Sequence, residues 1–341
     1  MNTIKYFCDG NTARGYQKKI EGNLSGISTI FGITTLSMKK ANEILLKIVK
    51  QLDQEEKELI YRADQPDWLA AIILPQKKIA IVHTVLFSDC LLTSELVFVE
   101  EPKNNKLFYE EKQNFLFNKK RAYDLYDKAL KIHDKWEKPY IEHMDFEKTN
   151  KYTKQFIEEL HLQPKNKKGI EKHRYLGAAT YLGSVDYLDD QTSAVKNRFF
   201  IKGRPGSGKS THLKKIASAA LEAGYEVETY HCGFDPNSLD MVIIRELDVC
   251  MFDSTAPHEY FPQRDGDLIV DHYELFIDQT VDATYEKELK DIAARYKQAV
   301  GDAKQYLIKA KQYLDQMEDL LDSQVDESLL EKFLNEIKLA K

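Results

Sequence analysis

Residues 203–211, GRPGSGKST, have the residue types and the spacing of a loop that binds phosphate groups. The pattern G-x-x-x-x-G-K-[ST] is matched by Gly203, Gly208, Lys209 and Ser210. Glycines allow the backbone to curl so that its N–H groups face the phosphates, and the following helix adds the partial positive charge of its N-terminus. We therefore expect a nucleotide to contact Gly203, Arg204, Pro205, Gly206, Ser207, Gly208, Lys209, Ser210 and Thr211.

Two side chains of this loop and one acid downstream predict a Mg²⁺ site. Lys209 is expected to reach the phosphates, and the Ser210 hydroxyl is expected to bind Mg²⁺. A strand that ends in an acid should complete the metal shell. The segment VCMFDST has Asp253 directly after the apolar residues 249–252, so the predicted metal ligands are Ser210 and Asp253.

The segments around the loop have the patterns of the elements that must position it. RFFI at 198–201 is typical of a buried strand. Helical spacing then continues until Gly224 through Leu213, Ile216, Ala217, Ala220 and Leu221. EVETYHC at 226–232 is typical of a further strand of a parallel α/β sheet. The second half is thus predicted to be a P-loop NTPase-like domain.

The chain also aligns with itself at an offset of 168 to 170 residues. In this register Gly15, Lys40 and Pro66 fall on Gly183, Lys209 and Pro236. FGITTLSMKKANEILLKI, from Phe31, lies opposite the phosphate loop and its helix. The sequence therefore predicts an α/β protein with two P-loop NTPase-like parallel-sheet domains from an internal duplication.

The first copy keeps its apolar strands but loses the phosphate chemistry. The positions of Gly203, Gly206, Gly208, Ser210 and Asp253 hold Thr34, Ser37, Lys39, Ala41 and His83. Side chains at 34 and 39 would obstruct the backbone approach that glycine allows, so we expect a degenerate first copy and one live site. Other polar residues replaced in the first copy are candidates for chemistry, or for ordinary polar contacts, in the second: His231, Asp235, Asp240 and His258. Of these, His231 and Asp235 are predicted to bind the nucleotide.

The residue that would activate a nucleophile is not at its usual position, because Ser254 rather than glutamate follows Asp253. Glu259, His258 and Asp235 are the candidate bases. Arg204 or Arg264 could neutralise charge on the γ-phosphate, and Arg14 or Arg62 could reach across from the first copy. The predicted catalytic residues are Lys209, Asp253, Glu259, His258 and Arg264.

Long helices follow each copy of the sheet. Alternating steps of three and four connect Leu289, Ile292, Tyr296, Ala299, Ala303, Tyr306, Ala310, Tyr313, Met317 and Leu320. The same spacing connects Ala122, Tyr126, Ala129, His133 and Trp136 until Pro139. These stripes are expected to pack on each other or on the sheets. The alternative is a mobile arm that covers the site or docks an unknown protein partner.

Length and composition fit two domains joined near residue 165. The domains predicted from the 341 residues are 1–162, with an appendage over about 106–160, and 170–341, with an arm over about 283–341. QPKNKKG at 163–169 is the linker. A formal net charge of −6 offers no basic field for nucleic acid or membranes. With four scattered cysteines and no long apolar run, we expect a soluble, cytoplasmic protein.

Three segments carry a family resemblance: RFFIKGRPGSGKSTHLKKIA, VETYHCGFDPNSLDMVIIREL and CMFDSTAPHEYFPQRDGD. They resemble the second half of a family of bacterial tandem P-loop ATPases, common in Gram-positive bacteria and without an assigned role. The resemblance covers most of the chain and implies that the nucleotide is ATP. Members commonly have a phosphate loop in both copies, and FGITTLSMKKAN departs from that pattern.

The residues fit three kinds of nucleotide protein. The first is an ATPase with Mg²⁺ at one live site, whose turnover moves the helical arms. The second is a small-molecule or nucleotide kinase that holds its acceptor near His231, Asp235 and His258. The third is a scaffold that binds ATP and a partner without hydrolysis. The sequence has no [NT]KxD guanine-reading motif and no LSGGQ-like signature, which argues against Ras-like and ABC proteins.

Overall fold

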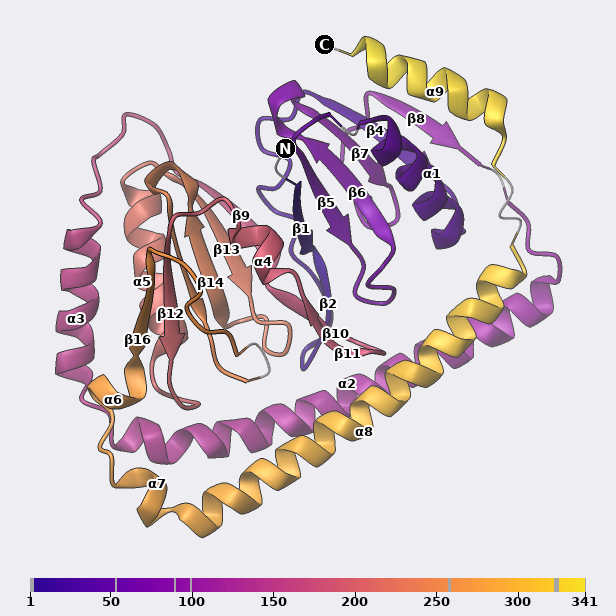
Figure 1. Cartoon of the computed structure of the whole chain (residues 1–341). Coiled ribbons are helices and arrows are strands. Elements are labelled where there is room, and N and C mark those ends of the chain that lie inside the picture. Colours follow the sequence, from indigo (N-terminus) through magenta and orange to yellow (C-terminus); the bar gives the residue numbers. More distant parts are fainter. Residues whose placement is uncertain are drawn as a thin grey trace.

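The computed structural model describes residues 3–52, 54–88, 90–98, 100–256, 259–321 and 325–340. The main strands of the first half are β1 (Thr3–Phe7), β4 (Thr29–Thr34), β5 (Lys57–Tyr61), β6 (Leu69–Leu74), β7 (Ile79–His83) and β8 (Ser94–Val97). Those of the second half are β9 (Ile170–Tyr175), β12 (Asn197–Lys202), β13 (Glu226–His231), β14 (Leu239–Ile244), β15 (Val249–Asp253) and β16 (Asp267–Asp271). All join in one 12-stranded sheet, in the order β16-β12-β15-β14-β13-β9-β1-β5-β6-β7-β4-β8 (Figure 1).

The two halves repeat one element order on either side of the β1–β9 seam. Each begins with a strand and a small hairpin, formed by β2 (Asp9–Thr12) with β3 (Gly15–Lys18) and by β10 (Gly177–Thr180) with β11 (Gly183–Asp186). The register shifts at corresponding points, between Ile60 and Tyr61 and between Tyr230 and His231. At the seam, Phe7 pairs with Tyr175 in antiparallel register.

The expectation of purely parallel sheets is wrong in one respect. β14 runs antiparallel to both β13 and β15, and β6 does the same between β5 and β7. The connection 232–238 is shorter than the dozen or so residues that a parallel crossover needs, so the chain has to turn back directly. The predicted strands at 198–201, 226–232 and 249–252 are confirmed as β12, β13 and β15.

Helices α1 (Met38–Gln51) and α5 (Lys209–Glu222) follow β4 and β12 and pack on the sheet. The predicted apolar face of α5 is buried: Leu213 and Ile216 pack with Val242 and Met251. Burial of each such side chain contributes about 1.5–3 kcal/mol. This packing fixes the start of α5 at the end of β12.

The two longest helices, α2 (Asn105–Glu142) and α8 (Glu286–Asp319), lie side by side below both halves of the sheet (Figure 1). Their predicted stripes pack on each other in the region of Ala303, which shares a cluster with Ala122 and Tyr126 of α2. Beyond Ala303 the predicted α8 stripe is off by one residue, because Leu307, Leu314 and Glu318 are buried where Tyr306, Tyr313 and Met317 were expected. The expected end of the first stripe at Pro139 is wrong, because α2 continues to Glu142. Only the final helical turn follows Pro139, so its missing N–H removes one hydrogen bond close to the end of the helix.

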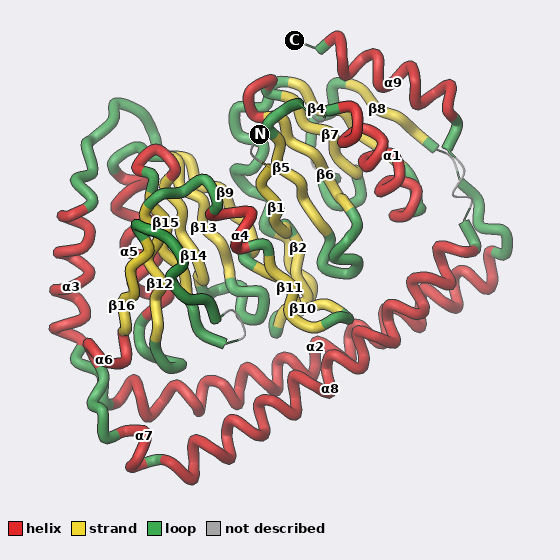
Figure 2. Tube along the Cα trace, viewed as in Figure 1, coloured by secondary structure: helices red, strands yellow, loops and turns green. Residues whose placement is uncertain are grey.

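The helix that follows each of these two packs on the other half of the sheet. α3 (Phe146–Glu159) buries Phe156 against α5 in the second half. α9 (Glu327–Leu339) buries Leu330, Phe333, Leu334 and Ile337 in the core of the first half. The short helices are α4 (Leu188–Thr192), α6 (His272–Phe276) and α7 (Val281–Thr284). Figure 2 shows α3 and α9 at opposite outer sides of the molecule.

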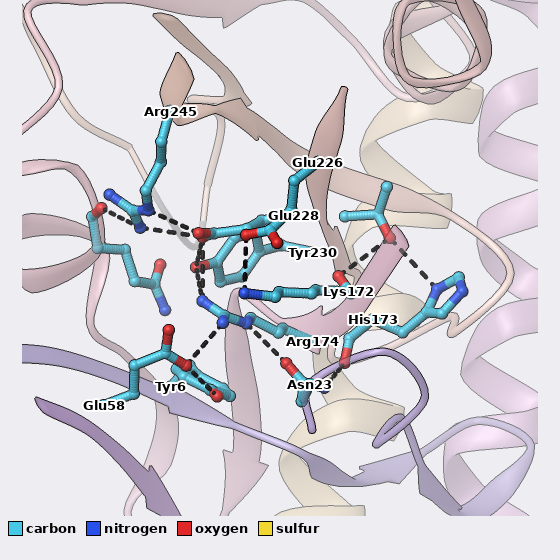
Figure 3. A network of polar contacts seen from close by, with 12 residues as sticks. Tyr6, Asn23, Glu58, Lys172, His173, Arg174, Glu226, Glu228, Tyr230 and Arg245 are labelled. Atoms are coloured by element: carbon cyan, nitrogen blue, oxygen red, sulfur yellow. Dashed lines mark hydrogen bonds and ion pairs between the residues drawn. The ribbon is translucent and has the colours of Figure 1, made fainter. Parts of the chain in front are cut away.

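A buried polar cluster holds the seam (Figure 3). Arg174 of β9 is fully buried, and its guanidinium donates to Glu58 of β5 at 2.7 Å and to Glu228 of β13 at 3.0 Å. Tyr6 of β1 donates to the same Glu58 oxygen at 2.6 Å, with its ring 3.9 Å from the guanidinium carbon. Because these residues come from four strands of both halves, the cluster fixes the sheet across the seam.

Among the described residues, the helices lack the combination of length and apolar character that a membrane crossing requires.

Candidate phosphate-binding site

The predicted phosphate loop lies between the end of β12 and the start of α5. Gly206 and Gly208 adopt left-handed backbone conformations, with φ of 76° and 80°. A Cβ atom at Gly206 would lie 2.7 Å from the carbonyl oxygen of Glu137, so glycine is needed there for conformation and for space. The loop curls as the sequence predicts, and α2 contacts it directly.

Lys209 is buried at the base of the loop. Its Nζ donates to the carbonyl oxygen of Arg204 at 3.0 Å and lies 3.6 Å from Asp253. Asp253 reaches this position because β15 pairs in parallel with β12, with Asp253 opposite Ile201. The predicted lysine and acid therefore lie together at one edge of the sheet, as open α/β sheets place their ligand groups.

The two predicted metal ligands each have a protein partner. The Ser210 hydroxyl accepts from the Leu239 N–H at 2.9 Å, which leaves one lone pair for a metal. One oxygen of Asp253 accepts from the Thr255 hydroxyl at 2.6 Å, and the other faces Lys209. Both groups keep acceptor capacity for Mg²⁺, which prefers a few protein oxygens together with phosphate and water.

A face of α2 that the sequence analysis did not assign to the site covers the loop. His133 and Glu137 lie one helical turn apart, and His133 Nδ1 is 3.6 Å from Glu137 Oε1. Burial raises the pKa of Glu137, with Asp134 adding to the effect, while Lys209 and the Gly206 N–H partly offset it. The ligand atoms of His133, Asp134 and Glu137 lie within 4.8 Å of one another, which is close enough to hold a cation. The signal in the sequence is HDKWE at 133–137, with His and Glu at i and i+4.

Two buried histidines lie next to the loop, one in the first turn of α5 and one at the start of α6. His272 faces the carbonyl oxygen of Ser207 through Nδ1 at 3.0 Å, and His212 faces the Thr153 hydroxyl at 2.9 Å. Burial lowers the pKa of His272 to about 4 and that of His212 to about 3, so both rings are neutral at pH 7. Among the described residues, no partner faces the buried Ser207 hydroxyl or His272 Nε2.

The two candidate arginines of the second half point to other partners. Arg204 donates to Asp282 of α7 at 2.7 Å and lies over the Tyr273 ring. Arg264 donates to carbonyl oxygens of Thr192 and Ser193, near the edge where β12 and β16 begin. Arg264 is therefore at the edge of the sheet opposite the loop, where it holds the start of β16.

The remaining candidates lie at different distances from the loop. Glu259 is half exposed and forms an ion pair at 3.7 Å with Lys202, the last residue of β12, so it lies on the side of the sheet where the loop begins. His231 is engaged by the Pro236 carbonyl oxygen and by His173, and burial lowers its pKa to about 4. His258 lies outside the described residues. Pro205 and Thr211 lie in the loop and the first turn of α5.

One arginine of the first half does cross to the second. Arg14 donates to Asp235 at 2.9 Å, and its backbone neighbour Ala13 donates to the carbonyl oxygen of Phe234. Arg62 remains in the first half, beside His83. Asp235 is thus held by Arg14, on the segment that follows β13.

The corresponding strand of the first half, β7, ends in a histidine and not in an acid. His83, at the position of Asp253, is fully buried and faces the Thr35 carbonyl oxygen at 3.2 Å. Burial, with Arg62 adding to it, lowers the pKa of His83 to about 4. Lys40, at the position of Lys209, pairs with Glu100 at 2.6 Å. This half therefore offers a neutral imidazole where the second half offers a carboxylate.

Comparisons with protein-family models, with curated proteins and with solved structures found no match to this chain.

Proposed function

We propose that this chain is an ATP-binding P-loop protein of the cytoplasm that hydrolyses ATP with Mg²⁺ at one site in its second half. The observation that carries the proposal is the position of Lys209, buried 3.6 Å from Asp253 at the end of a glycine-rich loop. A lysine for the phosphates and an acid for Mg²⁺ are the two parts that nucleotide hydrolysis of this type requires. The first half is the degenerate product of an internal duplication, related to the bacterial tandem P-loop ATPases.

The roles in this reaction follow from the positions of the groups. The Gly206 and Gly208 backbone and Lys209 would hold the β- and γ-phosphates, and Ser210 and Asp253 would hold Mg²⁺. Glu259, which pairs with the last residue of β12, would orient the attacking water. His133 and Glu137 of α2 lie close enough to Lys209 for its charge to act on both, so they would connect the site to the helical arm.

A nucleotide-dependent scaffold is the second candidate, and the contact between α2 and the loop favours it. Glu137 lies against Gly206, where the phosphates would bind, so ATP has to displace this part of α2. Displacement of a helix that packs along α8 would alter the surface of both arms. Such a protein would bind ATP tightly and release phosphate slowly.

The test is nucleotide stoichiometry and turnover on the purified chain with Mg²⁺, with and without a panel of phosphate acceptors. One ATP per chain with acceptor-independent phosphate release is the expected result. ADP formation that depends on an acceptor would identify a kinase, and tight binding without turnover would identify a scaffold. Two nucleotides per chain would contradict the single site.

Glu137→Gln is expected to increase ATP affinity by roughly threefold to tenfold, because a carboxylate no longer repels the γ-phosphate at Gly206. Titration of ATP at two salt concentrations would measure the change. Glu142→Gln is the matched control, since Glu142 lies on the same helix and is half exposed in a surface pair with Lys138. Equal effects of the two variants, or weaker binding in Glu137→Gln, would show that Glu137 does not compete with phosphate.

A further inference from the structure

The degenerate loop of the first half is filled by carboxylates of the chain itself. Glu318, near the end of α8, accepts from the Ser37 hydroxyl at 2.6 Å and from the backbone N–H groups of Met38 and Lys39 at 2.9 and 3.2 Å. Its side chain is 6 % exposed. Glu318 therefore occupies the N-terminus of α1. The corresponding position in the second half, at the N-terminus of α5, is where the phosphate loop is expected to hold phosphate.

A second carboxylate completes the arrangement. Glu100 accepts from the Thr35 hydroxyl at 2.6 Å and from the N–H groups of Leu36 and Ser37 at 2.6 and 3.2 Å. Its other oxygen lies 2.6 Å from the ammonium of Lys40, and both side chains are buried. Four successive backbone N–H groups, two hydroxyls and the lysine thus face two carboxylates, which is the donor set that a phosphate loop offers to phosphate.

We propose that the first-half loop is an anion site whose occupants are Glu100 and Glu318 of the same chain, in place of phosphate, and that it anchors the far end of α8. The anchored end leads into α9, which packs on the first half of the sheet. The partner helix α2 lies on the live loop through Glu137. One end of the helix pair is therefore fixed at the first-half loop, while its other end covers the phosphate loop of the second half.

Hydrogen exchange tests whether Glu318 anchors the end of α8 at the first-half loop. All variants carry Lys209→Ala, which weakens anion binding at the second-half loop. Glu318→Ala removes the acceptor, and we expect the amides of Met38 and Lys39 and the last turns of α8 to exchange about tenfold faster or more. Asp319→Asn is the matched control, since Asp319 is the exposed neighbour on α8. Unchanged exchange in Glu318→Ala, or an equal change in Asp319→Asn, would overturn the proposal.

Chemical rescue tests the anion site itself. Formate or inorganic phosphate, against chloride at equal ionic strength, is expected to raise the thermal midpoint of Glu318→Ala and to slow its exchange at residues 37–39. Glu318→Gln keeps the volume without the charge, so it should fold if the alanine variant does not, exchange faster than the parent at 37–39, and show no rescue. Rescue of the parent or of Asp319→Asn to the same extent, or absence of rescue in a folded Glu318→Ala, would contradict an anion site.

Discussion

Lys209→Ala is expected to lower ATP affinity on the order of tenfold to a hundredfold and to remove most of the hydrolysis. Lys209 is the lysine of the G-x-x-x-x-G-K-[ST] pattern, and it lies 3.6 Å from Asp253 at the edge where the phosphates would bind. A charge-assisted hydrogen bond contributes about 1.5–3 kcal/mol, and each 1.4 kcal/mol is tenfold in affinity. Titration calorimetry with Mg²⁺ and a slowly hydrolysed ATP analogue would measure the loss.

The matched control at the first-half loop needs two substitutions. Lys40→Ala alone would leave the buried Glu100 carboxylate without its cation, and it is expected to cost about 3–5 kcal/mol of stability. Burial raises the pKa of Glu100, but Lys40, Thr35 and the Leu36 N–H outweigh burial and lower it overall. Lys40→Met with Glu100→Gln removes both charges at similar volume, and we expect ATP affinity within about twofold of the parent. Loss of a bound nucleotide in this double variant would mean that the first half binds ATP.

The sequence predicted the parts of the site that are close together along the chain. Gly203 to Thr211 form one segment, and the apolar run before Asp253 marks its strand, so a local pattern was enough. The parallel pairing of β12 with β15 then places Asp253 beside the loop. This part of the prediction needed only the rule that parallel strands end at one edge.

The contacts of α8 with the first-half loop and of α2 with the phosphate loop could not be predicted in this way. Ser37 and Glu318 are separated by 281 positions, and their contact depends on how α8 crosses the first half. Helical spacing places His133 in an apolar stripe and gives no role to Glu137, because this spacing indicates which face of a helix is buried but not which loop the helix contacts. The short distance of Arg264 from Asp253 along the chain predicts a place at the site, but the turn into β16 takes Arg264 to the opposite edge of the sheet.

The second large effect is expected at the seam, where Arg174→Met should lower the free energy of unfolding by about 3–5 kcal/mol at pH 7. The fully buried guanidinium is shared by Glu58 and Glu228, and its removal leaves both carboxylates in the core. Arg245 still contacts Glu228 at 2.6 Å, but its donors do not replace the bond to Glu58. Urea unfolding followed by circular dichroism would measure the loss.

The pH dependence separates lost charge pairing from lost packing in this variant. Burial raises the pKa of Glu228, but Arg174 and Arg245 outweigh burial and lower it to about 2. This carboxylate therefore stabilises the parent above its unfolded pKa of about 4.3, and the stabilisation is lost as pH falls toward 2. Without Arg174 the pKa of Glu228 should rise, so the difference between variant and parent should shrink from pH 7 to pH 5.

A triple variant completes the argument for the seam. Adding Glu58→Gln and Glu228→Gln to Arg174→Met removes the buried charges together, and we expect it to recover a large part of the lost stability. Arg245→Met is the control at the rim, because Arg245 is partly exposed and its ion pair is with Glu228 and not with Glu58, so its loss should be smaller. If the Arg174→Met loss is the same at pH 5 and pH 7 and the triple variant is no more stable, the guanidinium acts through packing on Tyr6, and charge pairing does not hold the two halves of the sheet together.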